Sequence, residues 1–369
     1  MLSPVRARRL SRTIMLLFFA LISLPGSEVQ AQAITTQPKA ASGPCGNPAA
    51  DRLLQQGHST WPTSGYGLPP VVARAGEALT YFRLAVAEDP KCAEAWVDLA
   101  RAEIGFPSWP GLPPSVRFPQ AQAAATRAIE LQENSAEAHA LLGSVDFNTG
   151  KWAPAEEEYR RAIALAPNSA AYHADYARFL AAMGHARQAV SEIEQARKLA
   201  NGSPPMDVAA GEIYYWTRQY DKAITLIRAA AGANPSDGIV NFLLGWAYVG
   251  EKKWPDAAEA FQKAVPLTDR DAGDVMSLAY VYASDGQRNR VPPMLEEVEE
   301  KTSLMYVPVY RIAATYVALG DKEQALQWLQ RAYSDDYGWM VWLKVDPVMD
   351  PLRSDPRFQS LLARMKFPQ

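Results

Sequence analysis

The side chains that could do chemistry are few, and their spacing favours no reaction. None of the histidines stands in a metal-ligand spacing such as H-E-x-x-H, and neither a C-x-x-C pair nor a G-x-S-x-G turn occurs. His139 and His173 lie 34 residues apart, so they could face each other and hold a metal or relay a proton. A packed, hydrogen-bonded pair is the preferred interpretation. The sequence predicts no catalytic residue, no metal site and no cofactor.

The sequence contains two cysteines, Cys45 and Cys92, and does not decide whether they form a disulfide. In an oxidising compartment they could form a disulfide, which would stabilise the fold by roughly 4 kcal/mol in the chain-entropy model. Two unpaired thiols are the alternative, and the sequence favours neither because it does not fix the distance between them.

Residues 1–33 have the three parts of a secretory signal peptide. Four arginines at positions 6–12 form a basic head, an apolar run follows at 14–24, and Ala31-Gln32-Ala33 offers a small-x-small cleavage site. The apolar run is 11 residues long, whereas a membrane-spanning helix needs about 20. We therefore expect export to the periplasm or the medium, with an uncleaved N-terminal membrane anchor as the alternative.

Charge and composition restrict the partners. The formal charge is −3, and no block of basic residues follows the N-terminal head, which argues against nucleic acid as a main partner. A hydrophobic content of 48% is ordinary for a folded domain. No second apolar run is long enough to span a membrane. The oligomeric state cannot be predicted.

From Ala136 to Tyr337 the sequence repeats every 34 residues without an insertion or a deletion. Three columns of this repeat hold small residues, and one column holds bulky residues. Small residues at these spacings allow two antiparallel helices to approach closely. The small columns begin at Gly143, Ala155 and Ala162, and the bulky column reads Tyr159, Ile193, Ile227, Phe261, Leu295 and Leu329.

This pattern resembles the tetratricopeptide repeat, a 34-residue helix-turn-helix unit. Residues 138–143 (AHALLG) are similar to the family's first helix, 150–155 (GKWAPA) to its turn and second-helix start, and 162–167 (AIALAP) to its exit. Residues 320–326 (GDKEQAL) match equally well. The resemblance implies an all-α, right-handed solenoid of about seven to eight helix-turn-helix units that ends in a capping segment.

We expect five parts along the chain. They are a signal peptide (1–33), a linker (34–47), two elongated N-terminal units (48–135), six 34-residue repeats (136–337) and a C-terminal cap (338–369). The elongated units share an insertion, W-P followed by G-L-P-P, and equivalent loops of adjacent repeats emerge on one edge. Trp61 and Trp109 should therefore pack together. A final helix should cover the last hairpin through Phe358, Leu361, Leu362 and Met365.

The resemblance also implies that the first helix of each unit lines an inner groove where partners bind. The middle repeats place mostly aromatic side chains there, whereas earlier repeats place small and polar ones such as Ser144 and Arg178. An aromatic groove suits an amphipathic helix or an extended apolar segment. Packing of these rings against neighbouring helices or the array's own ends is the alternative. The predicted partner-binding residues are Glu212, Tyr215, Trp216, Phe242, Trp246, Met276, Tyr280 and Tyr310.

We therefore expect a non-catalytic scaffold or assembly factor of the bacterial cell envelope, which binds another protein or peptide. One alternative is a sensor that holds a glycan or a small apolar molecule on stacked aromatic side chains. The other is an accessory subunit of an envelope enzyme. The Lys and Asn set that clamps carboxylates in chaperone-binding members of the family is not reproduced, so a C-terminal acidic tail is not the expected ligand.

Overall fold

The computed structural model describes residues 43–61, 69–105, 114–304, 307, 309–335 and 337–368. Within these ranges all regular structure is helical. None of the described helices is both long enough and apolar enough to cross a bilayer. The expected signal peptide and Trp109 lie outside the described residues, and so does the expected packing between the two insertions.

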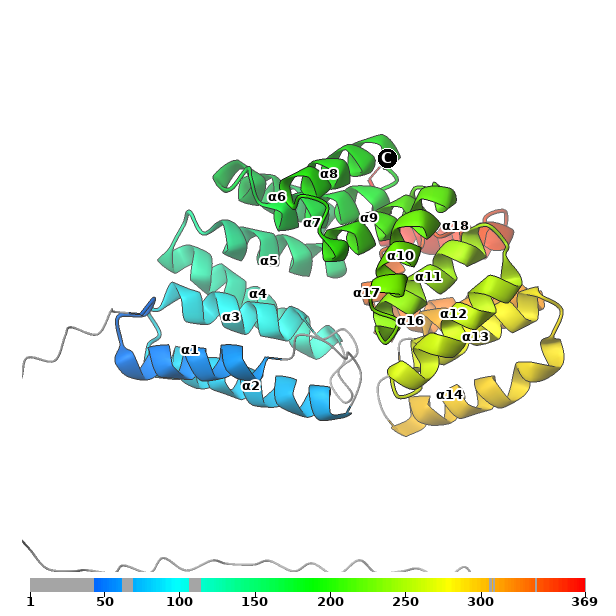
Figure 1. Cartoon of the computed structure of the whole chain (residues 1–369), viewed down its shortest axis with the longest axis horizontal. Helices are drawn as coiled ribbons and strands as arrows, with labels where there is room; N and C mark the ends of the chain where they lie inside the picture. The colour runs from blue at the N-terminus through cyan, green and yellow to red at the C-terminus, as the bar shows by residue number, and fades with distance from the viewer. Residues whose placement is uncertain are drawn as a thin grey trace, which may run out of the picture. The chain divides into compact units, whose positions relative to one another are not determined.

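The described helices up to residue 335 form eight hairpins, each a pair of neighbouring helices that pack along their length. Figure 1 shows the hairpins stacked in chain order, from blue α1–α2 to yellow α13–α14. The first four are α1 (Pro48–Thr60) with α2 (Pro69–Glu88), α3 (Ala93–Ile104) with α4 (Pro114–Leu131), α5 (Ala136–Asn148) with α6 (Trp152–Leu165), and α7 (Ala170–Ala182) with α8 (Ala186–Leu199). The last four are α9 (Pro204–Trp216) with α10 (Tyr220–Ala233), α11 (Gly238–Gly250) with α12 (Trp254–Leu267), α13 (Ala272–Ser284) with α14 (Pro292–Leu304), and α15 (Tyr310–Leu319) with α16 (Lys322–Asp335).

Each hairpin closes where a small residue of its first helix meets a bulky residue of its second. A Cβ atom added to Gly211 would lie 2.3 Å from Ile227 Cγ1, and one added to Gly245 would lie 2.7 Å from the Phe261 ring. Side chains cannot approach so closely, so glycine permits this contact and larger residues do not. Ile227 and Phe261 are fully buried as a result. The small and bulky columns of the repeat therefore face each other within one hairpin.

The turn inside a hairpin uses a left-handed backbone conformation at one fixed repeat position. Glycine fills this position in four hairpins, at residues 150, 184, 286 and 320, where φ lies between 74° and 83°. Arg218 and Lys252 fill it in two further hairpins, with φ of 62° and 56°. A side chain in this conformation costs roughly 1–2 kcal/mol, which a contact made by that side chain can offset.

The predicted pairing of His139 with His173 is wrong, because each ring holds its own hairpin together. His173 Nε2 lies 3.0 Å from the carbonyl oxygen of Pro167, and its Nδ1 lies 2.6 Å from the carboxylate of Glu192. His139 makes the same two contacts one hairpin earlier, at 3.0 and 2.5 Å. The imidazole thus links the loop before the first helix to the second helix, and the 34-residue spacing reflects a repeated structural role.

The N-terminal hairpin is tied to the next one by a disulfide between Cys45 and Cys92. Cys92 is the N-cap residue of α3, and Asn47 caps α1 through its side-chain oxygen. The bridge closes a loop with a sequence separation of 47, which removes unfolded-state entropy worth roughly 4 kcal/mol. Of the two possibilities that the sequence left open, the structure has the disulfide.

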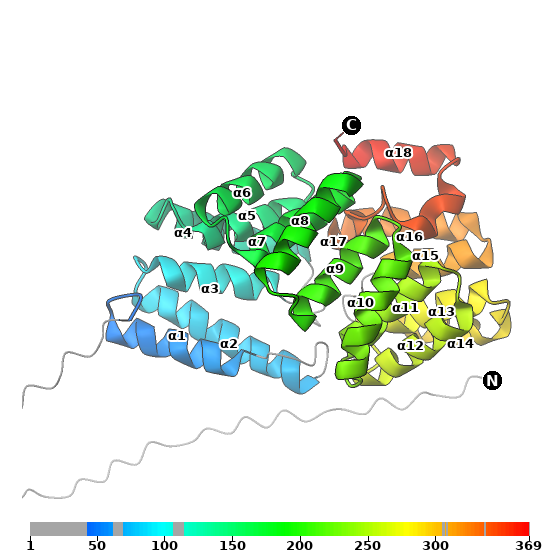
Figure 2. The same ribbon diagram turned by 45° about the horizontal axis from the view of Figure 1, so that its top comes forward.

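After α16 the chain leaves the repeat through α17 (Tyr337–Met340), η2 (Pro347–Leu352) and α18 (Pro356–Met365). α18 packs on α16 (Figure 2). Its first helical turn is capped by Asp355, whose carboxylate accepts from the Arg357 backbone N–H. Phe358, Leu361 and Met365 are buried on this helix, and Leu362 is half-buried. These are the side chains that the sequence predicted for a capping helix.

Asn241 occupies the repeat position of His173. It shows which hydrogen bond a smaller side chain still makes at this position. Its Nδ2 donates to the Pro235 carbonyl at 3.0 Å. His173→Asn should keep the equivalent bond to Pro167 and lose the Glu192 contact, which lowers the free energy of unfolding by about 1 kcal/mol. His173→Ala loses both contacts and leaves a gap, at a cost of about 2–3 kcal/mol. Urea unfolding measures the two losses, and equal values would contradict this account.

Candidate functional site on the inner face

The first helices of successive hairpins contact one another and form the inner face of the array. The structure brings the eight predicted partner-binding residues together on this face, but it buries most of them. Glu212, Phe242 and Tyr280 are half-buried, whereas Tyr215, Trp216, Trp246, Met276 and Tyr310 are at most 6% exposed. Residues 338–352, which we call the C-terminal segment, contact two of them, Trp216 through Trp342 and Tyr310 through Asp346. The buried side chains thus pack within the array and against its own end, which was the alternative interpretation. That they bind a partner stays a prediction.

An indole stack fixes the C-terminal segment to the middle of the inner face. The rings of Trp342 and Trp216 lie 4.2 Å apart with an interplanar angle of 6°. The Phe147 ring meets Trp342 edge-on at 6.2 Å. Because Phe147 belongs to α5 and Trp216 to α9, one side chain of the C-terminal segment joins two hairpins that are not neighbours.

A buried ion pair fixes the same segment to α15. Tyr310 donates its hydroxyl to Asp346 at 3.0 Å, and Arg311 Nη1 lies 3.8 Å from the same carboxylate. Burial raises the pKa of Asp346, while Arg311 and the hydrogen bonds to the carboxylate act in the opposite direction. The Arg311 guanidinium also lies 4.0 Å from the Trp246 ring centre and 4.8 Å from that of Trp339. The positive charge of Arg311 is therefore stabilised both by the carboxylate and by the faces of two aromatic rings.

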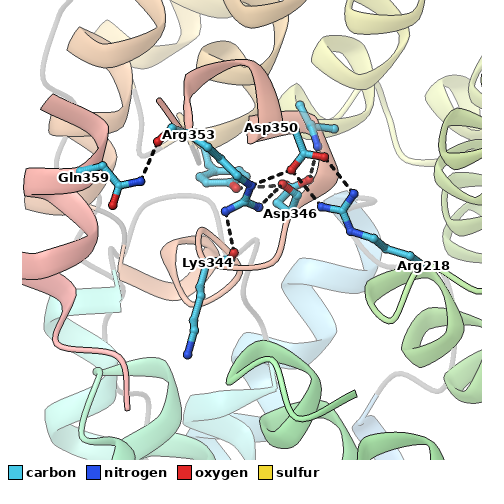
Figure 3. Close-up of polar contacts among 8 residues, drawn as sticks. Arg218, Lys344, Asp346, Asp350, Arg353 and Gln359 are labelled. Carbon is cyan, nitrogen blue, oxygen red and sulfur yellow. Dashed lines mark hydrogen bonds and ion pairs between the residues drawn. The ribbon is translucent and has the colours of Figure 1, made fainter. Parts of the chain in front are cut away.

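At the edge of the segment, Asp350 accepts hydrogen bonds from two arginines (Figure 3). Arg218 donates through both terminal nitrogens at 2.8 and 2.9 Å, and Arg353 Nε donates at 2.7 Å. Desolvation opposes ionisation of Asp350, but the bonds from Arg218 and Arg353 lower its pKa below the ordinary value. Arg218 is one of the two non-glycine residues in the left-handed turn position, and this contact offsets the backbone strain there.

The end of the chain also crosses back to the earlier hairpins. Lys344 Nζ donates to the carbonyl of Met183, the C-cap residue of α7, at 3.0 Å. Trp152 Nε1, at the start of α6, donates to the carbonyl of Met365 at 2.9 Å. The Trp152 ring stacks on Phe367 at 4.9 Å. These contacts link hairpins α5–α6 and α7–α8 to the end of the chain.

A cavity of about 270 Å³ remains on the inner face beside the C-terminal segment. It is lined by α3, α4, α5, α6, α7, α9 and residues 338–342. Its apolar walls include Ile104, Phe118, Phe147, Trp339 and Trp342, and its polar walls include Ser144, Asn148, Asp175, Arg178 and Glu212.

The polar wall centres on one arginine between two carboxylates. Arg178 Nη2 donates to Glu212 at 2.8 Å, while its Nη1 lies 3.9 Å from Asp175. Burial raises the pKa of Asp175, Arg178 lowers it, and Glu212 raises it further. Attraction to Glu212 is the largest of the effects that raise the pKa of Arg178. The side chains of Asp175 and Arg178 keep about 40% of their surface accessible and line the cavity with it.

The sequence predicted this site only in part. Of the eight predicted residues, Glu212 lines the cavity, and the polar columns of the earlier repeats supply Ser144 and Arg178. Asp175 was missed, although it lies three residues before Arg178 and therefore on the same helix face. Trp339 and Trp342 were missed because they lie outside the repeat. In the described part of the chain, no group of three or more His, Cys, Asp or Glu side chains could hold a metal ion.

Family models described as tetratricopeptide repeat match residues 117–170, 208–274 and 309–334. Within these residues the hairpins match tetratricopeptide-repeat models, and the described part of the chain is an all-α solenoid of repeated hairpins. No curated protein matches the sequence.

Solved structures are similar to this chain at low identity. A human IFIT1 dimer with m7Gppp-AAAA has a TM-score of 0.54 at 15% identity and covers 79% of this chain and 74% of its own. The thermophilic protein TTC0263 of Thermus thermophilus has a TM-score of 0.46 at 19% identity, over 55% of this chain and 100% of its own. A chain of the APC/C hetero-tetramer Cut9–Hcn1 gives 0.49 at 17% identity, over 63% of this chain, which spans 42% of that one.

The left-handed position offers a test of the Arg218 anchor with a matched control. Lys252 fills the same position one hairpin later, and no ion pair involves it among the described residues. Lys252→Gly should relieve backbone strain and raise the free energy of unfolding by up to about 1 kcal/mol. Arg218→Gly relieves the same strain but loses the half-exposed pair with Asp350, which is worth about 1 kcal/mol.

Chemical denaturation of the two variants and the parent chain measures this difference. We expect Lys252→Gly to be more stable than Arg218→Gly by about 1 kcal/mol. Amide exchange of residues 345–352 should accelerate in Arg218→Gly alone. Identical changes in both variants would contradict the assignment of Arg218 as an anchor.

Proposed function

We propose that this chain is a non-catalytic scaffold that holds another polypeptide on its inner face. The cavity between α5, α7, α9 and the C-terminal segment carries the proposal. It is concave, and it combines aromatic walls with a few polar side chains, which is the usual composition of a binding site. In a repeat array the inner surface is also the extended concave surface on which partners are held.

The size of the cavity supports a peptide segment as the ligand. Its volume of about 270 Å³ lies just below the range for pockets of small-molecule ligands, which begins at about 300 Å³. Such a space takes one or two side chains of an extended segment, not a whole helix. Asp175 and Arg178 offer an acceptor and donors beside it. The glycan alternative depended on open aromatic side chains, whereas Tyr215, Trp216, Trp246 and Tyr310 are at most 6% exposed.

Peptide display tests the proposal directly. A random-peptide phage library is selected on the mature chain, and the enriched peptides are titrated by calorimetry. Ser144→Leu, which places a larger side chain in the cavity wall, should weaken their binding at least about tenfold. Ser191→Leu makes the same change on the exposed face of α8 and should leave binding unchanged.

Thermal unfolding of both variants shows that each still folds. Peptides that bind equally well to the parent chain and to Ser144→Leu would place the binding surface elsewhere. Absence of any enriched peptide would count against polypeptide binding itself.

We further propose that the chain is exported from a bacterial cell and acts in the envelope. The composition of residues 1–33 supports export. The Cys45–Cys92 disulfide supports it independently, because such bonds persist in oxidising compartments and are rare in the cytosol.

Expression of the full-length chain in a bacterial host tests export. Mass spectrometry of the periplasmic fraction should find an N-terminus at Ile34 and a mass that corresponds to the closed disulfide. Recovery of the uncleaved chain in the cytosol with two free thiols would contradict the proposal.

A further inference from the structure

We propose that the cavity binds a lysine side chain of the partner polypeptide, with Asp175 as its counter-ion. The inference rests on the proposed function, since it takes a polypeptide as the ligand. It adds the chemistry of the residue that enters the cavity.

The charges of Asp175, Arg178 and Glu212, the more accessible charged side chains of the cavity lining, do not balance. Arg178 lies between two carboxylates and gives its 2.8 Å hydrogen bond to Glu212. Asp175 is left 3.9 Å from the guanidinium, which is beyond hydrogen-bond distance. The charged groups that act on Asp175 are Arg178 and Glu212. The three side chains together carry one net negative charge, which a monovalent cation would neutralise.

The environment of Asp175 disfavours its negative charge, and its accessible surface lies in the cavity lining. Burial is the largest cause of the raised pKa of Asp175, so its carboxylate is poorly compensated in this environment. Its side chain is 41% accessible and lines the cavity. Arg117 also lines the cavity, but it is 3% exposed and presents little surface to a ligand. A cation that enters would therefore meet the Asp175 carboxylate.

The aromatic walls favour the same kind of ligand. Phe147, Trp339 and Trp342 line the cavity together with Asp175, and the faces of such rings attract cations. The protein already uses one of them in this way, because the Arg311 guanidinium lies 4.8 Å from the Trp339 ring centre. A carboxylate and aromatic rings in the lining of one cavity thus suit a cationic head on an apolar stem.

Lysine fits this arrangement better than arginine. Its ammonium group is compact, and its four-carbon stem can lie along apolar walls. A guanidinium is best held by two parallel bonds to one carboxylate. Glu212 already accepts bonds from Arg178 and from Trp216 Nε1, at 2.8 and 3.4 Å, and Asp175 shares its wall with the Arg178 guanidinium. A second arginine would crowd that group, whereas an ammonium needs one free carboxylate oxygen.

Titration of the mature chain with Nα-acetyl-lysine N-methylamide, followed by saturation-transfer NMR, tests the inference. Its norleucine counterpart has nearly the same stem and lacks the charge. We expect the lysine probe to bind about tenfold more tightly than the norleucine probe. Asp175→Asn, a nearly isosteric change, should abolish this difference. Asp269→Asn, the same change on the exposed loop after α12, should preserve it.

The outcomes are decisive in both directions. Equal affinity of the two probes, binding of neither, or a lysine preference that survives Asp175→Asn would overturn the inference. Tighter binding of n-butylamine than of the lysine probe would overturn the peptide ligand in favour of a free amine. If Asp175→Asn unfolds, Ser144→Leu replaces it, and both probes should then lose binding.

Failure of this inference can be told apart from failure of the proposed function. Display-selected peptides that contain no lysine, but lose affinity in Ser144→Leu, would overturn the lysine assignment and leave the scaffold function in place.

Discussion

The docking of residues 338–352 on the inner face is the contact on which the rest of the structure depends. Hairpins of a repeat array contact only their neighbours, so the array is held by short-range interfaces. The C-terminal segment adds contacts that cross several hairpins, since Trp342 meets both Phe147 and Trp216. Burial drives this docking, because each large apolar side chain removed from water contributes about 1.5–3 kcal/mol. The fully buried members are Met340, Val341, Leu343, Met349 and Leu352.

Apolar burial does not by itself decide how the segment lies, and the buried charges supply that information. A buried ion pair contributes little net stability, but leaving one partner alone in the interior costs several kcal/mol. Arg311 is 3% exposed and Asp346 is fully buried, so a slip of the segment along the face would strand both charges. Asp346 also caps η2 through the Val348 backbone N–H at 2.9 Å. The Asp346 carboxylate therefore fixes the register of the segment and also caps the N-terminus of η2.

The sequence predicted the hairpins well because their determinants are local and periodic. Gly211 and Ile227 lie 16 residues apart, and the same pair of small and bulky positions recurs every 34 residues. This recurrence predicts their contact. The inner face was harder to predict, because periodicity shows which side chains lie on it but not what covers them. Trp342 and Phe147 are 195 positions apart and belong to no common pattern. Nor does the turn position give a reliable signal. Arg218 and Lys252 both replace glycine there, but among the described residues Arg218 alone of the two forms an ion pair.

The composite cavity couples ligand binding to the docking of the C-terminal segment. The repeat helices supply its polar wall, and residues 338–342 supply part of its aromatic wall. A ligand that touches both walls must favour the docked arrangement by its differential affinity for that state, and docking must favour the ligand by the same factor. The apolar contacts that dock the segment also order Trp339 and Trp342 before any ligand arrives, so less entropy is lost on binding. The segment that covers Trp216 and Tyr310 thereby also holds two aromatic side chains of the cavity lining in place.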